Sequence, residues 1–503
     1  MNTIKLKLLP LYVFSLLLIF SCSSDDGDPE PVVINNPDEE IDDFIWKGMN
    51  FLYLYKTDVP DLQDSKADDE NAYRQFLASY DSPESLFQDL RTTNTLQGEL
   101  EDQFSIIVDD YVAQEENLFG GITKNNGMAF GLGRFSGTDD LFGFVRYVLP
   151  GTDAEAKGVT RGDLFTTING TQLNLSNYRD LLFNGPDIYD VGFNTIENNA
   201  FVPANTVTLN KVEYTENPVF ISKTIDYQGQ KIGYMMYNSF TFAFNKQMND
   251  AFLAFKNEGI TDLILDLRYN GGGSVYTATG LASMITGAYT GEIFAKSVFN
   301  PDYTAFINQF SNADDFLTDR FFDNIIIDIS DNDVITSEPV NSLGLSRLHV
   351  LASGSSASAS ELIINSLSSY IDVIQIGTST LGKFQASRLV YDSPDFRRDD
   401  ANPNHTYAMQ PLVSKVANKD DVTDFILGLP ADVVFQEDFR NMGVLGEVDE
   451  PHLNVALEYI VNNTTAAARS KDFVDFELVG ESKMNSPSYQ RMYIDNIPLE
   501  GRN

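Results

Sequence analysis

The chain contains few of the residues on which metal and disulfide proteins are built. Its 503 residues include one cysteine, three histidines and one tryptophan. A single cysteine excludes an intramolecular disulfide framework, and the scarcity of cysteine and histidine leaves few ligands for zinc or an iron–sulfur cluster. We therefore expect neither a metal site nor a disulfide-stabilised fold.

Basic residues are scarce as well. The sequence has 34 Lys and Arg against 73 Asp and Glu, a formal charge of −39 at pH 7. Such a negative surface repels phosphate backbones, which argues against nucleic acid as a partner. A hydrophobic content of 43% with 12% aromatic residues excludes a disordered or fibrous chain. The length suffices for about three domains with a sizeable core.

The one long apolar run lies at the N-terminus. Residues 8–20 are mostly apolar and follow two lysines, but a membrane-spanning helix needs about 20 apolar residues. The run therefore predicts a signal peptide. Cys22 follows in Ile19-Phe20-Ser21-Cys22, which resembles a bacterial lipobox, and the resemblance implies cleavage before Cys22 and lipidation of its thiol and new amine. The alternative is an ordinary secretory signal with a coincidental cysteine.

Under this reading residues 1–21 are the lipoprotein signal peptide and residues 22–40 an acidic tether, rich in Asp, Glu, Pro and Asn. Beyond the tether, apolar residues recur at helical spacing, and the pattern stays mainly helical to about residue 116. The residues that mark the first helix are Ile41, Phe44, Ile45, Met49 and Leu52. We interpret residues 41–126 as a structural, helical N-terminal domain.

From about residue 127 the pattern changes to short β-type runs with glycine turns. A strand candidate at 143–148 is followed by a Pro-Gly turn, a short run of small residues, an Arg-Gly-Asp turn, and a strand that ends in Asn-Gly. This order resembles a PDZ domain, and we assign residues 127–215 to a PDZ-like, β-rich domain.

PDZ domains bind peptide C-termini by adding a strand to an exposed sheet edge. Free N–H groups in a glycine-containing loop receive the terminal carboxylate. Gly131, Leu132 and Gly133 match such a loop and are the predicted peptide-binding residues. An ordinary turn is the alternative for this triplet.

Residues 216–460 alternate between strand and helix patterns. A strand at 232–237 precedes a helix face marked by Met248, Phe252 and Phe255, and a continuously apolar strand follows at 263–267. Strand–helix–strand order predicts an α/β core with a mixed or parallel sheet covered by helices. Residues 461–503 form a C-terminal tail without a clear motif, which we expect either to pack on the core or to fray.

Two segments of this core are rich in small residues. The strand at 263–267 runs into Asn270 and three glycines, where backbone amides can approach a ligand closely; alone, such a sequence usually makes a tight turn. A second strand at 350–352 leads through a serine-rich elbow into an apolar helix. There Ser358-Ala359-Ser360-Glu361 also reads as a capping box, with Ser358 as the N-cap residue and Glu361 three positions later.

The two segments together resemble the C-terminal processing peptidases, or tail-specific proteases, a family of Ser–Lys hydrolases. That family shows Asp-Leu-Arg-x-Asn-x-Gly-Gly, then Ser-Ala-Ser-Ala-Ser-Glu, then Gly-Lys, and all three occur here in this order. The resemblance covers roughly residues 41–460. It implies that Ser358 is the nucleophile and Lys383 the general base. It also implies that the amides of Ala359 and of one glycine, most closely Gly272, form the oxyanion hole.

The proposed base needs an unusual environment. A free lysine has a pKa of about 10.4 and cannot accept a serine proton at neutral pH. Burial in an apolar pocket would lower that pKa, so that a neutral Lys383 could deprotonate Ser358. Many relatives carry a glutamine four residues after the lysine that orients it. Here that position is Ser387, so Gln385, Ser387 or another group must orient Lys383. The alternative for this lysine is a surface salt bridge.

Other hydrolytic chemistries fit the sequence less well. No Gly-x-Ser-x-Gly elbow surrounds the serine, and no His-Glu-x-x-His motif is present. We place His349 on a core strand, His405 in a loop and His452 at the start of an amphipathic helix, which disfavours a Ser–His–Asp triad.

The sequence therefore predicts a lipid-anchored serine endopeptidase of the cell envelope, acting on proteins through their C-termini or exposed segments, without metal or organic cofactor. The tether would attach it to a membrane, predicted to be a bacterial outer membrane on its periplasmic or surface side. Two alternatives remain open. One is a non-catalytic peptide- or ligand-binding lipoprotein on the same fold, and the other is a scaffold in which only the PDZ-like module acts.

Overall fold

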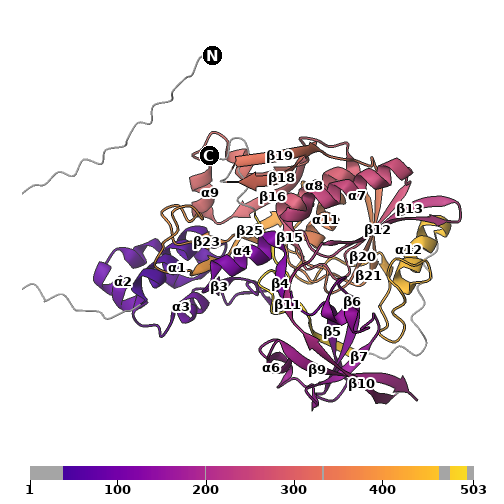
Figure 1. Cartoon of the computed structure of the whole chain (residues 1–503). Helices are drawn as coiled ribbons and strands as arrows, with labels where there is room; N and C mark the ends of the chain where they lie inside the picture. The colour runs from indigo at the N-terminus through magenta and orange to yellow at the C-terminus, as the bar shows by residue number, and fades with distance from the viewer. Residues whose placement is uncertain (1–37, 199, 331–332, 464–475, 495–503) are drawn as a thin grey trace, which may run out of the picture.

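The computed structural model describes residues 38–198, 200–330, 333–463 and 476–494 (Figure 1). The predicted signal peptide, Cys22 and nearly all of the tether lie outside these residues. Helices of the N-terminal region lie on one side of an α/β core, and a β-rich unit projects from the core in another direction (Figure 1). Within the described ranges, no helix has the length and apolar character needed to cross a membrane.

The N-terminal region begins with three helices, and the first one confirms the predicted apolar spacing. Helix α1 (Glu39–Leu52) buries Phe44, Ile45, Met49 and Leu52. Short 3₁₀ turns lead to the other two helices, α2 (Glu70–Leu77) and α3 (Pro83–Asp89), which are capped by Asp69 and Ser82. Because the buried face of α1 packs into one cluster with core residues, these helices are attached to the core.

The prediction of a mainly helical region to residue 116 misses three short strands. They are β1 (Thr95–Leu96), β2 (Glu99–Leu100) and β3 (Ile106–Val108). Strands β1 and β2 pair with each other, whereas β3 pairs with β24 (Ala408–Gln410), whose other neighbour is β23 (Val390–Tyr391). The pairing partner of β3 lies about 300 residues away, and such a distant partner leaves no local sequence signal.

Two chain crossings connect the β-rich unit to the rest. Helix α4 (Tyr111–Gly120) ends at Gly121 and leads into β4 (Ile122–Asn125). Strand β4 pairs antiparallel with β11 (Val212–Thr215), by which the chain leaves the unit. The segments that enter and leave the unit therefore lie side by side (Figure 1).

The β-rich unit is an antiparallel sheet with two short helices. The strand order is β10-β9-β7-β6-β5-β27, with β8 paired to β7. Its elements are β5 (Met128–Phe135), β6 (Leu141–Val148), α5 (Asp153–Ala156), β7 (Leu164–Ile168), β8 (Thr171–Gln172), α6 (Tyr178–Leu182), β9 (Ile188–Glu197), β10 (Ala200–Asn210) and, from the C-terminal region, β27 (Phe476–Glu481).

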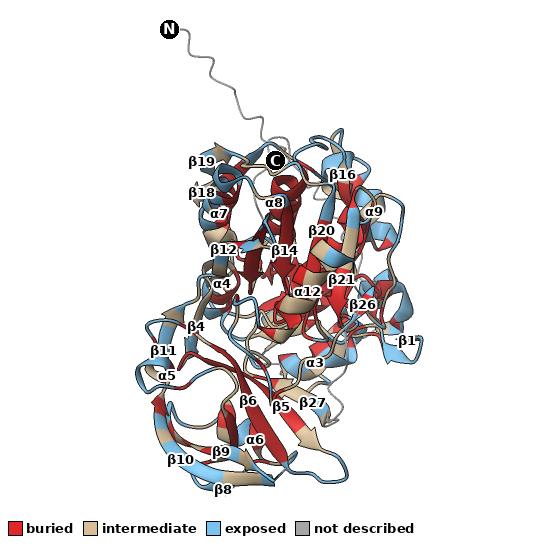
Figure 2. Cartoon of the chain, turned by 90° about the vertical axis from the view of Figure 1, so that its right-hand side faces the viewer, coloured by how far each residue is buried: buried red, intermediate tan, exposed pale blue. Residues whose placement is uncertain are grey.

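The core contains a six-stranded mixed sheet, as the alternating pattern predicts. Its order is β12-β13-β14-β20-β21-β26, in which β12 and β13 are antiparallel and the remaining neighbours are parallel. The strands are β12 (Val219–Tyr227), β13 (Gln230–Tyr237), β14 (Asp262–Asp266), β20 (Arg347–Ala352), β21 (Asp372–Gly377) and β26 (Val433–Val434). Figure 2 shows the central strands as almost wholly buried.

Helices cover both faces of this sheet. On one face lie α7 (Asn245–Glu258), α8 (Val275–Thr286) and α11 (Ala359–Leu367), which pack with Leu263 and Leu265 of β14. On the other face lies α12 (Pro451–Asn462), which packs with Ile264 of the same strand. Successive residues of β14 therefore point to opposite helical layers, and this accounts for the unbroken apolar run in the sequence.

A second six-stranded sheet lies beside the helical layer, in the order β15-β28-β22-β25-β16-β17. It contains β15 (Gly273–Ser274), β16 (Ile293–Phe299), β17 (Thr318–Arg320), β22 (Gln385–Ser387), β25 (Leu412–Ala417) and β28 (Met492–Tyr493). The remaining elements are helices α9 (Pro301–Ile307) and α10 (Ala313–Leu317) and the hairpin β18 (Asn324–Ser330) and β19 (Asp333–Pro339).

A glycine opposite an aromatic ring controls packing in the β-rich unit. Gly143 pairs with Phe165 across β6 and β7, and a Cβ at Gly143 would lie 2.0 Å from the Phe165 ring. Phe165 is fully buried, so Gly143→Ala should destabilise the protein by about 1–3 kcal/mol through overpacking. Chemical denaturation followed by tryptophan fluorescence and circular dichroism measures this change.

Gly120→Ala is the matched control, because Gly120 ends helix α4 and its added Cβ would meet only ordinary contacts of 3.5 Å. This substitution should leave the midpoint of denaturation unchanged or slightly raised. Equal effects of the two substitutions would contradict the role assigned to the Phe165 ring.

Candidate active site

The two small-residue segments meet where strands β14 and β20 end. These strands are parallel neighbours, so their carboxyl ends lie at one edge of the sheet. Two serines of the elbow bind the glycine segment: Ser356 Oγ donates to Leu267 O at 2.7 Å, and Ser360 Oγ donates to Asn270 O at 2.9 Å. The elbow and the glycine segment therefore form one hydrogen-bonded unit.

Ser358 lies between these two anchoring serines and behaves differently. It is fully buried, yet its Oγ has no hydrogen-bond partner among the described residues. Its φ of 66° with ψ of −115° is a sparsely populated conformation for a residue with a side chain. A strained turn between a strand and a helix presents the side chain of the turn residue in the manner of a nucleophile elbow.

Glu361 joins the serine elbow to the lysine loop. Its Oε2 accepts from the backbone N–H of Ser358 at 2.7 Å and of Lys383 at 2.9 Å. Its Oε1 accepts from Gly382 N and Thr380 Oγ1, both at 2.6 Å. Because one oxygen atom binds both backbone nitrogens, Ser358 and Lys383 are neighbours in space.

Of the two hydrogen bonds predicted for a capping box of Ser358 and Glu361, only one is formed. Glu361 accepts from the Ser358 N–H, but the Ser358 hydroxyl forms no capping hydrogen bond. Burial raises the pKa of Glu361 to about 7, and the four hydrogen bonds oppose this rise. The connecting role of Glu361 was not predicted, although the capping pattern marked the residue.

Lys383 is fully buried and its Nζ has no hydrogen-bond partner among the described residues. The Nζ lies 4.3 Å from the centre of the Phe104 ring. Burial lowers the pKa of Lys383 well below its ordinary value of 10.5, and the positive charge of Arg491 lowers it further. The carboxylates of Asp102 and Glu361 act in the opposite direction. This is the environment that an unprotonated lysine requires.

The N-terminal region supplies part of that environment, which the sequence did not reveal. Besides Phe104, it contributes Asp102, a buried carboxylate that accepts from Tyr53 OH at 2.6 Å and from Ser105 N at 2.9 Å. Both residues precede the lysine by more than 250 positions. Only the packing of the N-terminal helices on the core brings them to Lys383.

The glycine predicted for the oxyanion hole lies against the serine. Gly272 has a φ of 109°, and a Cβ there would lie 2.6 Å from Ser358 Cβ and 3.0 Å from Ser358 Oγ. Only glycine permits this approach. In this structure the Gly272 N–H donates to Asn270 Oδ1 at 2.8 Å, so it does not face a vacant oxyanion position. The oxyanion role of Gly272 stays a prediction, and Asn270 is an additional residue of the site.

The other predicted oxyanion donor, Ala359, is the fully buried first residue of helix α11. A helix N-terminus presents free N–H groups and a positive dipole end, which suits an oxyanion. This position is compatible with the prediction.

The group that orients Lys383 stays a prediction. The Gln385 Nε2 donates to Tyr55 OH at 3.0 Å and to Glu101 O at 3.1 Å, which directs its amide nitrogen to the N-terminal region. Its Oε1 is buried without a hydrogen-bond partner in the described part of the chain. Ser387 is engaged elsewhere, since its Oγ donates to Met492 O and accepts from Gln410.

Other residues of the first motif have structural roles. Arg268 is buried and forms ion pairs with Asp266 and Glu450, each at 2.8 Å. The same cluster reaches the β-rich unit through Arg161, whose Nη2 lies 2.5 Å from Glu437. Breaking such a buried pair would leave an uncompensated charge, so this cluster fixes the unit against the core.

The placement predicted for Gly131, Leu132 and Gly133 requires correction. These residues form no loop but lie in the middle of strand β5, between β6 and β27. Their cross-strand neighbours explain the glycines: a Cβ at Gly131 would lie 2.4 Å from the Phe144 ring, and one at Gly133 would lie 2.5 Å from the Phe142 ring. The glycines make room for aromatic rings rather than for a turn.

The described contacts of the three histidines do not involve Ser358. His349 is buried on β20, and burial lowers its pKa to about 4. His405 Nε2 pairs with Asp392 at 3.0 Å, and the Nε2 of His452 in helix α12 lies 2.9 Å from Ile376 O. The strand and helix positions of His349 and His452 are as predicted, and these partners assign none of the three to a triad with Ser358.

Two segments of the chain match models of known protein families. The model of peptidase family S41 matches residues 231–393, which include Ser358, Lys383 and the glycine segment, and the model of the peptidase S41 N-terminal domain matches residues 40–106. Two segments of the chain thus match domains of peptidase family S41. Peptidases of this family are serine proteases.

Relatives of the S41 domains include a chloroplastic C-terminal processing peptidase of Tetradesmus obliquus. It is 28% identical over 150 residues, which are 27% of this chain and 32% of that protein. The chain thus matches about a third of the length of this curated relative.

Among solved structures, a putative S41 protease from Bacteroides fragilis superposes with a TM-score of 0.60 at 21% identity, covering 84% of this chain and 97% of that one. At this identity the likeness is one of fold. The photosystem II D1 C-terminal processing protease gives a TM-score of 0.47 at 18% identity, with 84% of this chain and 99% of that one covered.

The buried lysine of this S41 core should make stability depend on pH. The folded state releases the Lys383 proton at a lower pH than the unfolded chain does. The unfolded chain therefore carries more protons between the two pKa values, and the free energy of unfolding rises with pH across that window. Lys383→Met removes this titration. We expect the variant to be at least about 1 kcal/mol more stable at pH 7, with the difference shrinking as the pH approaches 10.5.

Denaturation curves measured from pH 6 to pH 10 test this expectation. Lys256→Met, at an exposed position on helix α7, is the matched control and should show no pH-dependent difference from the natural protein. A Lys383→Met difference that is absent, or that stays constant with pH, would contradict a neutral buried lysine.

Proposed function

We propose that the protein is a lipid-anchored serine endopeptidase of the cell envelope that cleaves peptide bonds through Ser358 and Lys383. One observation carries this proposal: a serine hydroxyl and a lysine amine are both buried, both lack a partner in the described residues, and their backbones bind one carboxylate oxygen. Burying unpaired polar groups costs free energy. A fold that retains two of them on neighbouring backbone segments points to chemistry, and we propose that the hydroxyl and the amine, which are not hydrogen-bonded to each other in this structure, meet when substrate binds.

The residues divide the reaction into two halves. Neutral Lys383 takes the proton of Ser358 Oγ as that oxygen attacks the carbonyl carbon of a peptide bond, giving a tetrahedral intermediate. Lys383 then protonates the leaving amine, and an acyl-enzyme remains on Ser358. Water, deprotonated by Lys383, hydrolyses the ester and restores the pair.

The negative charge of the tetrahedral intermediate needs fixed donors. The Ala359 N–H at the start of helix α11 is one candidate, and a glycine amide from 271–273 is the second. Gly272 is the preferred glycine because of its contact with Ser358. Its N–H would have to leave Asn270 Oδ1 when substrate binds.

Substrate recruitment is assigned to the β-rich unit at 127–215. Its order of strands and short helices supports a PDZ-like module, and the outer edge of β5 is paired with β27, a strand added from the C-terminal region. We propose that this edge binds protein C-termini or exposed segments. The name of the chloroplastic relative, a C-terminal processing peptidase, supports protein C-termini as targets.

The observation that favours catalysis over binding alone is the lysine environment. A peptide-binding protein has no need for a lysine whose pKa burial keeps far below its ordinary value. The same geometry would be a liability in a scaffold, because the unpaired groups only destabilise it.

Substitution of the nucleophile tests the reaction. Ser358→Ala should lower the rate of cleavage of an envelope-protein extract at least about a thousandfold while leaving the circular dichroism spectrum unchanged. Lys383→Arg should be equally inactive, because an arginine stays protonated. New peptide termini are identified by mass spectrometry, with Ser65→Ala at an exposed serine as the active control.

A serine-directed acylating probe separates the enzyme from the binder. It should label the natural protein at Ser358 and leave Ser358→Ala unlabelled. Full cleavage by both variants, or no labelling of the natural protein, would sink the Ser–Lys assignment.

Replacement of the tether cysteine tests the anchor. Because Cys22 carries the proposed lipid, Cys22→Ser should move the protein from the membrane fraction to the soluble fraction. A metabolic label with a fatty-acid analogue should be incorporated by the natural protein alone. Membrane association of Cys22→Ser that equals that of the natural protein would refute anchoring through this residue.

A further inference from the structure

Residues 476–494, here called the C-terminal strap, connect the β-rich unit to the active site. The strap begins as strand β27 on the edge of β5, continues past helix α4, and ends as strand β28 between β15 and β22 (Figure 1, yellow). It had no motif in the sequence. Its two strands lie where a substrate would be recruited and where it would be cut.

The strap occupies the proposed recruitment edge by strand addition. In β27, Leu478 pairs with Gly133 and Glu481 pairs with Gly131. The next residue continues the contact, since Ser482 N donates to Phe130 O at 2.9 Å and Ser482 Oγ accepts from Phe130 N at 3.2 Å. Peptide ligands bind PDZ-like sheets by this same backbone pairing.

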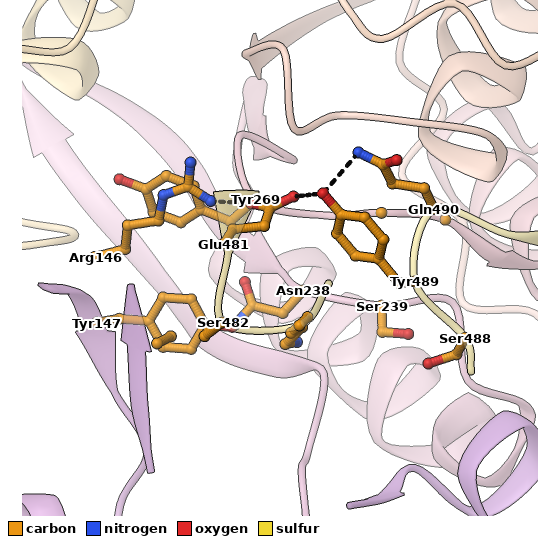
Figure 3. A pocket seen from close by; sticks show the side chains of 14 residues that line it. Arg146, Tyr147, Asn238, Ser239, Tyr269, Glu481, Ser482, Ser488, Tyr489 and Gln490 are labelled. Atoms are coloured by element: carbon orange, nitrogen blue, oxygen red, sulfur yellow. Dashed lines mark hydrogen bonds and ion pairs between the residues drawn. The ribbon is translucent and has the colours of Figure 1, made fainter. Parts of the chain in front are cut away.

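A buried ion pair fixes the end of β27. The Glu481 carboxylate binds Arg146 of β6 and accepts from Ser355 Oγ at 2.9 Å and from Tyr489 OH at 2.6 Å. Figure 3 shows Arg146, Glu481 and Tyr489 side by side along the strap. Ser355 belongs to the serine elbow, so the carboxylate joins the recruitment edge to the loop that bears Ser358.

Beyond this point the strap crosses the glycine segment. A Cβ at Gly271 would lie 3.1 Å from Gln490 N, and a Cβ at Gly272 would lie 3.0 Å from Arg491 O. The cavity that remains between the strap, Arg146 and these glycines has a volume of about 50 Å³. That space holds a few water molecules and not a peptide. Ser358 does not line this cavity and is fully buried.

We propose that the C-terminal strap is an internal competitor for the peptide path, and that the ligands which displace it are extended protein segments with an aromatic side chain followed by a carboxylate. This inference rests on the proposed function, whose site and recruitment edge it deepens. The side chains of the strap indicate which ligand chemistry fits the groove beside β5, because they occupy that groove in this structure.

Two contacts define that chemistry. The Phe476 ring lies 5.6 Å from those of Phe142 and Phe144 and 5.4 Å from that of Phe439, in an aromatic cluster between the β-rich unit and the core. The Glu481 carboxylate meets the Arg146 guanidinium. An incoming segment would place its aromatic side chain in the cluster and a side-chain or terminal carboxylate on Arg146.

Competition between the strap and a ligand for the same groove determines the apparent affinity of that ligand. A ligand binds only the fraction of molecules from which the strap has dissociated, so its apparent dissociation constant is its intrinsic constant divided by that fraction. Glu481→Gln removes the charge that holds the strap and leaves Arg146 free for the ligand. The open fraction should rise about tenfold or more.

The first test measures binding without proteolysis. A fluorescent synthetic peptide that copies residues 476–494 is titrated into the full chain carrying Ser358→Ala, alone and with Glu481→Gln. The second protein should bind the peptide at least about tenfold more tightly. Glu477→Gln, at an exposed partner of Arg134 on the same strand, is the matched control and should leave the affinity unchanged. Equal affinity of the Glu481→Gln and control proteins overturns the proposal.

A reversible cross-link provides the second test and does not depend on how well Glu481→Gln folds. Glu477 and Arg134 are directly paired across β27 and β5, a separation that a disulfide can span. The test protein has a new cysteine pair on the two strands and lacks the natural cysteine and the nucleophile (Arg134→Cys, Glu477→Cys, Cys22→Ser, Ser358→Ala). Oxidation of this protein should abolish peptide binding, and reduction should restore it. Binding that is the same in both redox states overturns the proposal.

Measurements of proteolysis then distinguish a failure of the strap proposal from a failure of the proposed peptidase function. With intact Ser358, Glu481→Gln should lower the KM for protein substrates about tenfold or more and leave kcat near its natural value. If no variant cleaves, the proposed function fails while the binding tests still decide the role of the strap. A Glu481→Gln enzyme with raised KM or reduced kcat contradicts competition and makes the strap a structural part of the site.

Discussion

The active site depends on one buried carboxylate. Glu361 accepts four hydrogen bonds, two from the lysine loop backbone, one from Thr380 and one from the Ser358 backbone. Its Oε2 binds the residue that bears the hydroxyl and the residue that bears the amine, so a single atom sets their relative position. Burial works against this arrangement, because it raises the pKa of the carboxyl to about 7. The hydrogen bonds offset that cost, and they exist only when both loops are in place. The serine and lysine motifs therefore form one structural unit, although they are separated in the sequence.

The electrostatic environment of Lys383 is set by two distant parts of the chain. Phe104 of the N-terminal region covers the amine, and Arg491 of the C-terminal strap adds a repelling charge, while Asp102 attracts the proton. Since burial is the largest cause of the lowered pKa, any movement that admits water to this pocket would raise it and protonate the amine. The packing of the N-terminal region, which supplies Phe104, is thus a condition for an unprotonated base. Under the proposed function, this links the N-terminal region to catalysis.

The sequence predicted those elements whose local residue pattern is determined by the same contacts that they make in the fold. The continuous apolar run of β14 and the helical spacing of α1 predicted elements of the mixed α/β fold. The three ordered motifs predicted which segments meet, and the backbones of Ser358 and Lys383 do so at Glu361, while the catalytic roles of the two residues stay predictions. The sequence failed where the reason for a residue lies across the fold. Gly131 and Gly133 suggested a loop, because glycine favours turns, yet they are glycines because Phe144 and Phe142 fill the space of their side chains. Asp102, Phe104 and the strap carry no local signal, because their partners lie hundreds of residues away.

Under the proposed function, competition by the strap would also keep the site of Ser358 selective among peptide ligands. A segment tied to its own groove competes at an effective concentration on the order of millimolar, which no dilute ligand exceeds unless it binds the open path more tightly. Backbone pairing alone is available to almost any extended chain. The aromatic cluster and Arg146 are therefore the contacts that distinguish one ligand from another, because only a segment that supplies both can replace what Phe476 and Glu481 already provide. Selection at the recruitment edge thereby becomes selection at the candidate active site, since the same strap pairs with that edge and crosses the glycine segment next to Ser358.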